Sequence, residues 1–136
     1  MECNLCNALN EEWRLLKKTK KCFCIIAKWP LKEGHIIILP IRHVENYSGL
    51  SEEEAKEMFE LVDEMDDVIK SKCGEDAIIY INKGKHGSER HIHLHIVPSK
   101  GNLRQLMSKY ENIPEKKDIP EKEMNKMRDK IISWKN

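Results

Sequence analysis

The sequence lacks any segment that would place the chain in a membrane. No uninterrupted apolar run approaches the roughly 20 residues that a membrane-spanning helix needs. The N-terminus has neither the basic region nor the apolar region of a secretory leader. We therefore expect no membrane partner and a cytoplasmic location.

Other absences exclude whole classes of function. The 24 basic and 23 acidic residues nearly cancel, and aromatic residues make up only 6% of the chain. A general nucleic-acid binder is usually basic and interleaves aromatic with basic side chains. The sequence also has no P-loop, dinucleotide-binding glycine motif or His-Glu-x-x-His zinc motif. Nucleic acid is thus not an expected partner.

The chain has 136 residues, of which 40% are apolar, so it suits one packed domain and is too short for two. Five cysteines without a leader indicate a reducing compartment. There, cysteine pairs more often bind metal or do redox work than form disulfides. Cys22, Cys24 and Cys73 are interpreted as small apolar residues. Cys3 and Cys6, spaced as Cys-x-x-Cys, are a separate case.

Apolar patterns predict strands and helices in mixed order. Residues 22–27, 36–39 and 77–81 are typical of short strands. Asn102 is placed to cap a short helix, and residues 121–134 follow helical spacing. Because strands and helices do not alternate strictly, the order favours an α+β fold with helices on an antiparallel sheet.

A long helix is predicted from Ser51 to Lys72. Ser51 and Glu54 have the spacing of a capping box, and Gly74 is placed to end the helix. Its predicted apolar stripe consists of Ala55, Met58, Phe59, Val62, Met65 and Ile69.

The most informative segment contains three alternating histidines. On a strand, His91, His93 and His95 share one face, and Pro98 is expected to end the strand. Alternate residues of a strand lie about 6.6–6.8 Å apart, so three histidines on a regular strand cannot easily bind one metal ion. The three side chains are therefore expected to have different roles.

Three blocks of the sequence stand out together: His91-x-His93-x-His95 followed by two apolar residues, Gly34-His35 with Pro40-x-x-His43, and Asn82-x-Gly84 with Gly87-Ser88. In this combination they resemble the histidine triad (HIT) family of nucleotide hydrolases and transferases. The resemblance implies a HIT-like fold, with an antiparallel sheet of about five strands, a long helix packed on it and a C-terminal helical extension. It also implies a single domain over residues 1–136, with a core over 1–100 and the extension over 101–136, which is similar to that of some prokaryotic members.

The resemblance further implies an enzyme acting on phosphorus–nitrogen or phosphoric anhydride bonds of nucleotides. His93 would attack the α-phosphate of a nucleoside phosphoramidate, aminoacyl adenylate or dinucleoside polyphosphate and form a nucleotidyl-histidine intermediate. His95 and His35 would assist. The substrate phosphate would be bound by Asn82, Gly87 and Ser88.

Some family members bind zinc through an N-terminal cysteine pair and two histidines. By the resemblance, the corresponding residues here are Cys3, Cys6, His43 and His91. Two sulfur and two nitrogen ligands close a tetrahedral site, which is the structural kind. The resemblance also implies a homodimer. The helix from Ser51 is expected either at the dimer interface or as a cover on the sheet.

The sequence departs from the family at Ala27, where an aspartate often binds the ribose, and around Glu89 and Arg90. These departures leave the nucleoside open. One alternative is therefore a module of the same fold that binds a nucleotide or a partner with negligible turnover. A Cys-x-x-Cys redox protein and a metal-dependent hydrolase with the triad as ligands are further alternatives.

Overall fold

The computed structural model describes residues 2–87 and 89–134. The chain divides into two compact units, Met1–Lys100 and Gly101–Asn136. Whether both belong to one functional domain stays a prediction. Within the described residues, no helix has both the length and the apolar character that crossing a bilayer requires.

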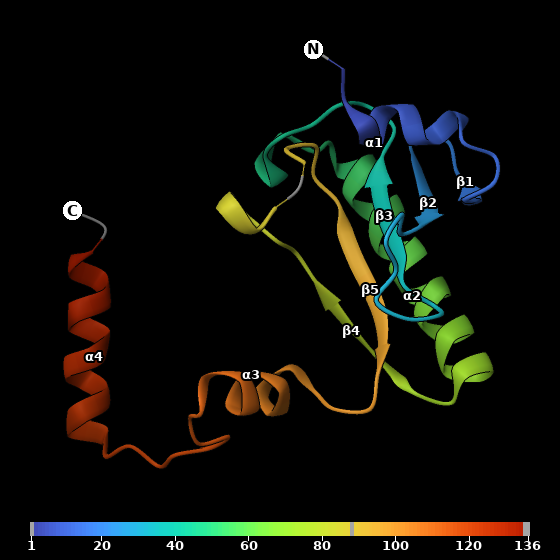
Figure 1. The fold of residues 1–136 in the computed structure, drawn as a ribbon. Coiled ribbons are helices and arrows are strands. Elements are labelled where there is room, and N and C mark those ends of the chain that lie inside the picture. Colours follow the sequence, from blue (N-terminus) through green and yellow to red (C-terminus); the bar gives the residue numbers. More distant parts are fainter. Residues whose placement is uncertain (1, 88, 135–136) are drawn as a thin grey trace. The chain divides into compact units, whose positions relative to one another are not determined.

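The first unit is built on one five-stranded sheet with the strand order β1-β2-β3-β5-β4 (Figure 1). Every neighbouring pair is antiparallel. The strands are β1 (Leu15–Lys18), β2 (Cys22–Ile26), β3 (Ile36–Pro40), β4 (Asp76–Tyr80) and β5 (Leu94–Ser99). The predicted α+β class with an antiparallel sheet of about five strands is thereby confirmed.

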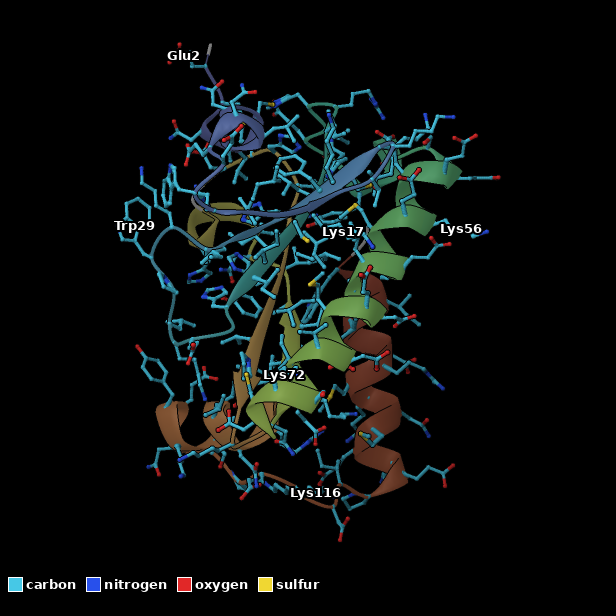
Figure 2. All side chains as sticks on the ribbon, turned by 90° about the vertical axis from the view of Figure 1, so that its right-hand side faces the viewer. Glu2, Lys17, Trp29, Lys56, Lys72 and Lys116 are labelled. Atoms are coloured by element: carbon cyan, nitrogen blue, oxygen red, sulfur yellow. The ribbon has the colours of Figure 1, made fainter. Side chains whose placement is uncertain are left out.

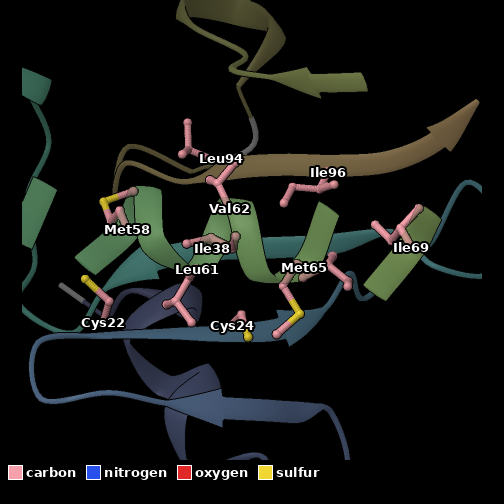
Figure 3. Packing of buried hydrophobic residues seen from close by; sticks show 11 residues of the cluster. Cys22, Cys24, Ile38, Met58, Leu61, Val62, Met65, Ile69, Leu94 and Ile96 are labelled. Carbon is pink, nitrogen blue, oxygen red and sulfur yellow. The ribbon is translucent and has the colours of Figure 1, made fainter. Parts of the chain in front are cut away.

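The helix α2 (Glu52–Cys73) covers one face of the sheet. Ser51 and Glu54 form the predicted capping box, and Gly74 ends the helix in the left-handed conformation at φ 68°. The buried residues between helix and sheet are Cys22, Cys24, Ile36, Ile38, Met58, Leu61, Val62, Met65, Ile69, Leu94 and Ile96 (Figure 3).

The predicted apolar stripe of α2 was wrong at Phe59, which is 62% exposed. Leu61 is buried in the core, although the stripe did not include it. At 3.6 residues per turn, Leu61 shares the face of Met58, whereas the side chain of Phe59 turns toward solvent.

The opposite face of the sheet is closed by the N-terminal segment. Here α1 (Asn4–Asn7) and the 3₁₀ helix η1 (Ala8–Asn10) place Leu5 and Ala8 against the sheet. The strand residues of this second core are Phe23, Ile25, Ile37 and Leu39, together with Ala27 just after β2. Figure 1 shows α1 at the end of the sheet where β3 finishes and β5 starts.

The strand of the triad begins at Leu94 and not at His91. Pairing with β3 starts at Leu94 opposite Ile38, whereas the N–H of Ile92 donates to the carbonyl of Val44 across 2.8 Å. The strand also continues through Pro98 to Ser99. Because pairing with β3 ends at Ile96, Pro98 is paired on one side only, where proline is tolerated.

The other elements are short. The 3₁₀ helices η2 (Tyr47–Gly49) and η3 (Gly84–His86) lie in loops. The second unit consists of α3 (Leu103–Glu111), which Asn102 caps as predicted, and α4 (Glu121–Ser133). Among the cysteines interpreted as apolar, Cys22 and Cys24 are buried, while Cys73 is exposed.

We predict that Gly34→Ala destabilises the protein by about 2–4 kcal/mol, because strain and overpacking add. Gly34 has φ 98°, and a Cβ atom there would lie 2.7 Å from Cγ of Pro98. Gly74→Ala is the matched control, because Gly74 also has positive φ but no atom within 4 Å of the added Cβ. It should cost only about 1 kcal/mol. Urea unfolding measures both, and equal costs would contradict the role of the Pro98 contact.

Candidate functional site

His35 is fixed at the start of β3 by a backbone hydrogen bond. It follows Gly34 directly and is buried. The N–H of Leu31 donates to its Nδ1 across 3.0 Å. A neutral imidazole that accepts at one nitrogen carries its proton on the other, so the proton lies on Nε2. This Nε2 is 2.9 Å from Nδ1 of His95 and donates to it.

The hydrogen bond from His35 fixes the tautomer of His95. It lies opposite Ile37 in the β3–β5 pairing, so its side chain is on the sheet face away from α2. Because its Nδ1 accepts from His35, its own N–H is on Nε2. Tyr80, opposite His95 on β4, stacks on the ring with centroids 4.5 Å apart and planes 2° apart. His95 is therefore held as a hydrogen-bond donor at Nε2.

His93 carries its ring proton on Nδ1, whereas His35 and His95 carry theirs on Nε2. Its Nδ1 lies 2.8 Å from the carbonyl oxygen of His91. Because a carbonyl only accepts, Nδ1 carries the proton and Nε2 keeps its lone pair. Tyr47 donates its O–H to the carbonyl of His93 across 3.3 Å. A buried ring with a free lone pair on Nε2 is suited to nucleophilic attack.

Burial keeps the two partner rings neutral. It lowers the pKa of His35 below the usual 6.5. It also lowers the pKa of His95 to about 4, and the nearby rings of His93 and His35 add to that shift. Both rings are thus uncharged at neutral pH and act through their hydrogen bonds.

Two cavities meet at the triad. The smaller one, of about 400 Å³, is lined by Asn4, Leu5, Asn7, Glu11, Arg14, Ala27, Lys28, Trp29, His35, Ile37, Glu89, His93 and His95. The larger one, of about 600 Å³, is lined by Glu45, Asn46, Tyr47, Asn82, Lys83, Gly84, Gly87, Glu89, Arg90, His91, Ile92 and His93. His93 and Glu89 line both. A molecule that spans the two cavities would therefore pass His93.

The predicted substrate-binding residues fall at the larger cavity. Asn82 and Gly87 line it together with His93. The predicted contact of Ser88 lies outside the described residues. The roles of these residues stay predictions, as do those of the histidines.

Two tyrosines of the site were missed from the sequence. Tyr80 could have been found, since it belongs to the strand predicted over residues 77–81 and pairing with the triad strand places it beside His95. No sequence signal marks Tyr47, because its contact with His93 depends on the course of a loop.

Beside the triad, four side chains form a compact group of potential metal ligands. They are Cys3, Cys6, His43 and His91, and their ligand atoms all lie within 4.8 Å of one another. The Sγ of Cys6 is 3.4 Å from Nδ1 of His43 and 3.2 Å from Nδ1 of His91. The Sγ of Cys3 is 3.6 Å from Nδ1 of His91. The structure thus brings together all four residues that the resemblance implied.

The surroundings of this cluster fit a metal ion. His91 donates from Nε2 to the carbonyl of Pro40 across 3.0 Å, and Nε2 of His43 lies 2.9 Å from Glu45. Such partners leave Nδ1 of each ring free to bind a cation. Burial raises the pKa of the Cys6 thiol to about 11, and Cys3 adds to the rise. A bound cation would counter this effect, because it stabilises thiolates.

We predict that His95 resists protonation down to about pH 4. Histidine takes up its proton near 6.5 in the unfolded chain, so the free energy of unfolding should fall as the pH is lowered through this window. An NMR titration of the His95 ring measures the midpoint. It also shows whether the neutral ring carries its proton on Nε2. A midpoint near 6.5 would contradict the prediction.

Comparisons with known proteins agree with this arrangement. The model of the family described as "Protein similar to CwfJ C-terminal" matches residues 1–112. An uncharacterized 16.1 kDa HIT-like protein of Mycoplasma pneumoniae is 28% identical over 101 residues, which cover 71% of this chain and 70% of that protein. A bis(5'-adenosyl)-triphosphatase of Dictyostelium discoideum is 27% identical over 85 residues, or 60% of this chain and 57% of that protein.

A solved structure shows the same fold. The hypothetical histidine triad nucleotide-binding protein of Sulfolobus tokodaii superposes with a TM-score of 0.63 at 28% identity. The match covers 73% of this chain and 70% of that one. Together, the family model, the relatives and the fold show that this chain belongs to the histidine triad family and to the CwfJ-like family that the model describes.

Proposed function

We propose that this chain is a nucleotide hydrolase or nucleotidyl transferase in which Nε2 of His93 attacks the α-phosphorus of a nucleotide derivative. One observation carries the proposal. The Nδ1–H of His93 is held by the carbonyl of His91, so its free nitrogen is presented where the two cavities meet. The nucleoside would lie in the smaller cavity and the leaving group in the larger one.

The proposed reaction has two displacements at phosphorus. The lone pair of Nε2 forms a P–N bond, and the leaving group departs with the electron pair of the bond that breaks. Nε2–H of His95 hydrogen-bonds a phosphate oxygen or the leaving atom, and an amine leaving group takes its proton from solvent. Water then attacks phosphorus, the P–N pair returns to His93, and the proton of water is released to solvent.

The substrates that fit this chemistry are nucleoside phosphoramidates, aminoacyl adenylates and dinucleoside polyphosphates. The relative named bis(5'-adenosyl)-triphosphatase supports the last class. Asn82 and Gly87, on the wall of the larger cavity, would bind phosphate oxygens. Ser88 is proposed for the same role from the resemblance alone.

We predict that His93→Ala lowers the release of nucleoside monophosphate by roughly 10³-fold or more, because the nucleophile is lost. The substrates are adenosine and guanosine 5'-phosphoramidates and a dinucleoside tetraphosphate. His86→Ala is the matched control, because His86 is exposed and lines neither cavity. After rapid quenching, mass spectrometry should find a nucleotidyl group on His93 in the wild type.

The same experiment separates the alternatives. Full release by His93→Ala would contradict attack by this residue. If the folded wild type binds nucleotides but releases monophosphate from none of the substrates, the enzyme proposal fails in favour of a binding module.

We further propose that Cys3, Cys6, His43 and His91 bind one structural zinc ion. Two thiolates and two imidazoles form the tetrahedral donor set that zinc prefers, and four protein ligands leave no position for substrate. The ion would tie α1 to the sheet beside the triad. The homodimer that the resemblance implies also stays a proposal, which sedimentation equilibrium tests.

We predict one zinc ion per chain by elemental analysis, and its loss in Cys6→Ser. Cys73→Ser is the control, because Cys73 is an exposed cysteine outside the cluster. Removal of zinc by a chelator should be slow and should lower the melting temperature, since ligand binding and folding are coupled. An immediate loss of activity at unchanged stability would instead support a catalytic metal.

A further inference from the structure

The smaller cavity contains an anchored ion pair that the proposed reaction does not use. Glu11 directly follows η1, and Arg14 precedes β1. Both line the cavity together with Ala27, as do His93 and His95. This pair offers a charged hydrogen-bonding group to whatever part of the ligand lies beyond the phosphate.

Arg14 is a fixed support for this group. It is only 5% exposed, and its Nε donates to the carbonyl of Ile26 across 3.0 Å. Its backbone is held as well, because the N–H of Arg14 donates to the backbone carbonyl of Glu11 and the carbonyl of Arg14 accepts from the N–H of Ile26. From this position, Nη1 donates to Oε2 of Glu11 across 3.3 Å. A buried guanidinium held in this way restricts the orientation of the carboxylate it binds.

The carboxylate of Glu11 has accepting capacity left. Within residues 2–87 and 89–134, its Oε1 takes part in no hydrogen bond. A carboxylate accepts and does not donate, so it fits a part of the ligand that offers hydrogen-bond donors, such as the two hydroxyls of a ribose. It would repel a phosphate group placed there.

The other residues of the smaller cavity suit other parts of a nucleotide than its sugar. Glu89 lies where the two cavities meet, beside His93, and already accepts from Nδ2 of Asn4 across 2.9 Å. Leu5, Ile37 and Trp29 offer apolar surface for a base, and Figure 2 shows Trp29 projecting at the edge of the molecule. Glu11 is then left for the sugar.

We propose that Glu11, oriented by the positioning residue Arg14, accepts hydrogen bonds from the vicinal hydroxyls of a ribose and so selects ribonucleotides over 2'-deoxyribonucleotides. This inference rests on the proposed function only in placing a nucleotide in the smaller cavity. It does not require turnover.

The test is equilibrium binding of adenosine 5'-monophosphate and its 2'-deoxy analogue to the full zinc-loaded chain, by titration calorimetry. The wild type should bind the ribonucleotide about 10-fold more tightly, the range of one hydrogen bond to a charged group. Glu11→Ala should bind both nucleotides equally, through loss of affinity for the ribonucleotide. Glu12→Ala is the matched control, because this exposed neighbour lies outside the cavity and should keep the preference.

Glu11→Gln guards against misfolding of the alanine variant. It keeps the size of the side chain and one accepting oxygen, so a reduced preference is expected. An unchanged preference in Glu11→Ala overturns the inference, and so does a wild type without preference. A wild type that discriminates between the two monophosphates but cleaves no substrate contradicts only the proposed function.

Discussion

The hydrogen bond from Nε2 of His91 to the carbonyl of Pro40 connects the two halves of the site. It fixes a fully buried ring at the end of β3, with Nδ1 facing the two cysteine sulfurs. The same residue uses its carbonyl oxygen to hold Nδ1–H of His93. One residue thus orients the group of potential metal ligands with its side chain and the proposed nucleophile with its backbone. A shift of His91 would therefore displace its own ring in the Cys/His cluster and the ring of His93 together.

The electrostatics of the triad follow from crowding and burial. The ring centroids of His35 and His95 are 5.1 Å apart, and those of His93 and His95 are 4.9 Å apart. A proton on His95 would be poorly solvated and close to two other rings, so the pKa of His95 is low. The hydrogen-bond chain from Leu31 through His35 to His95 then defines where each neutral ring donates. Proton positions are set by the fold rather than by solvent.

Local signals in the sequence predicted much of the fold. The cap at Ser51 and the stop at Gly74 depend only on a few neighbouring residues, and both were correct. Tertiary contacts decided the rest. The triad strand starts at Leu94 instead of His91, because the N–H of Ile92 is hydrogen-bonded to the carbonyl of Val44, which lies far from it in the sequence. No sequence pattern marks Arg14 as buried. Its side chain is held by the carbonyl of Ile26, a contact that forms only when the chain has folded.

The two edges of the sheet differ in chemical character. On one side, β1 presents the exposed Lys17 and Lys18, and charged residues of this kind discourage the addition of another strand. On the other side, β4 carries Ile79, and Ile81 follows it, with 45% and 42% of their surfaces exposed. In the sheet order β4 is the last strand, so within the described residues it has a neighbouring strand on one side only. Within the described residues, the β4 edge carries fewer charged side chains than the β1 edge, and a strand added there would pair with the strand that carries Tyr80.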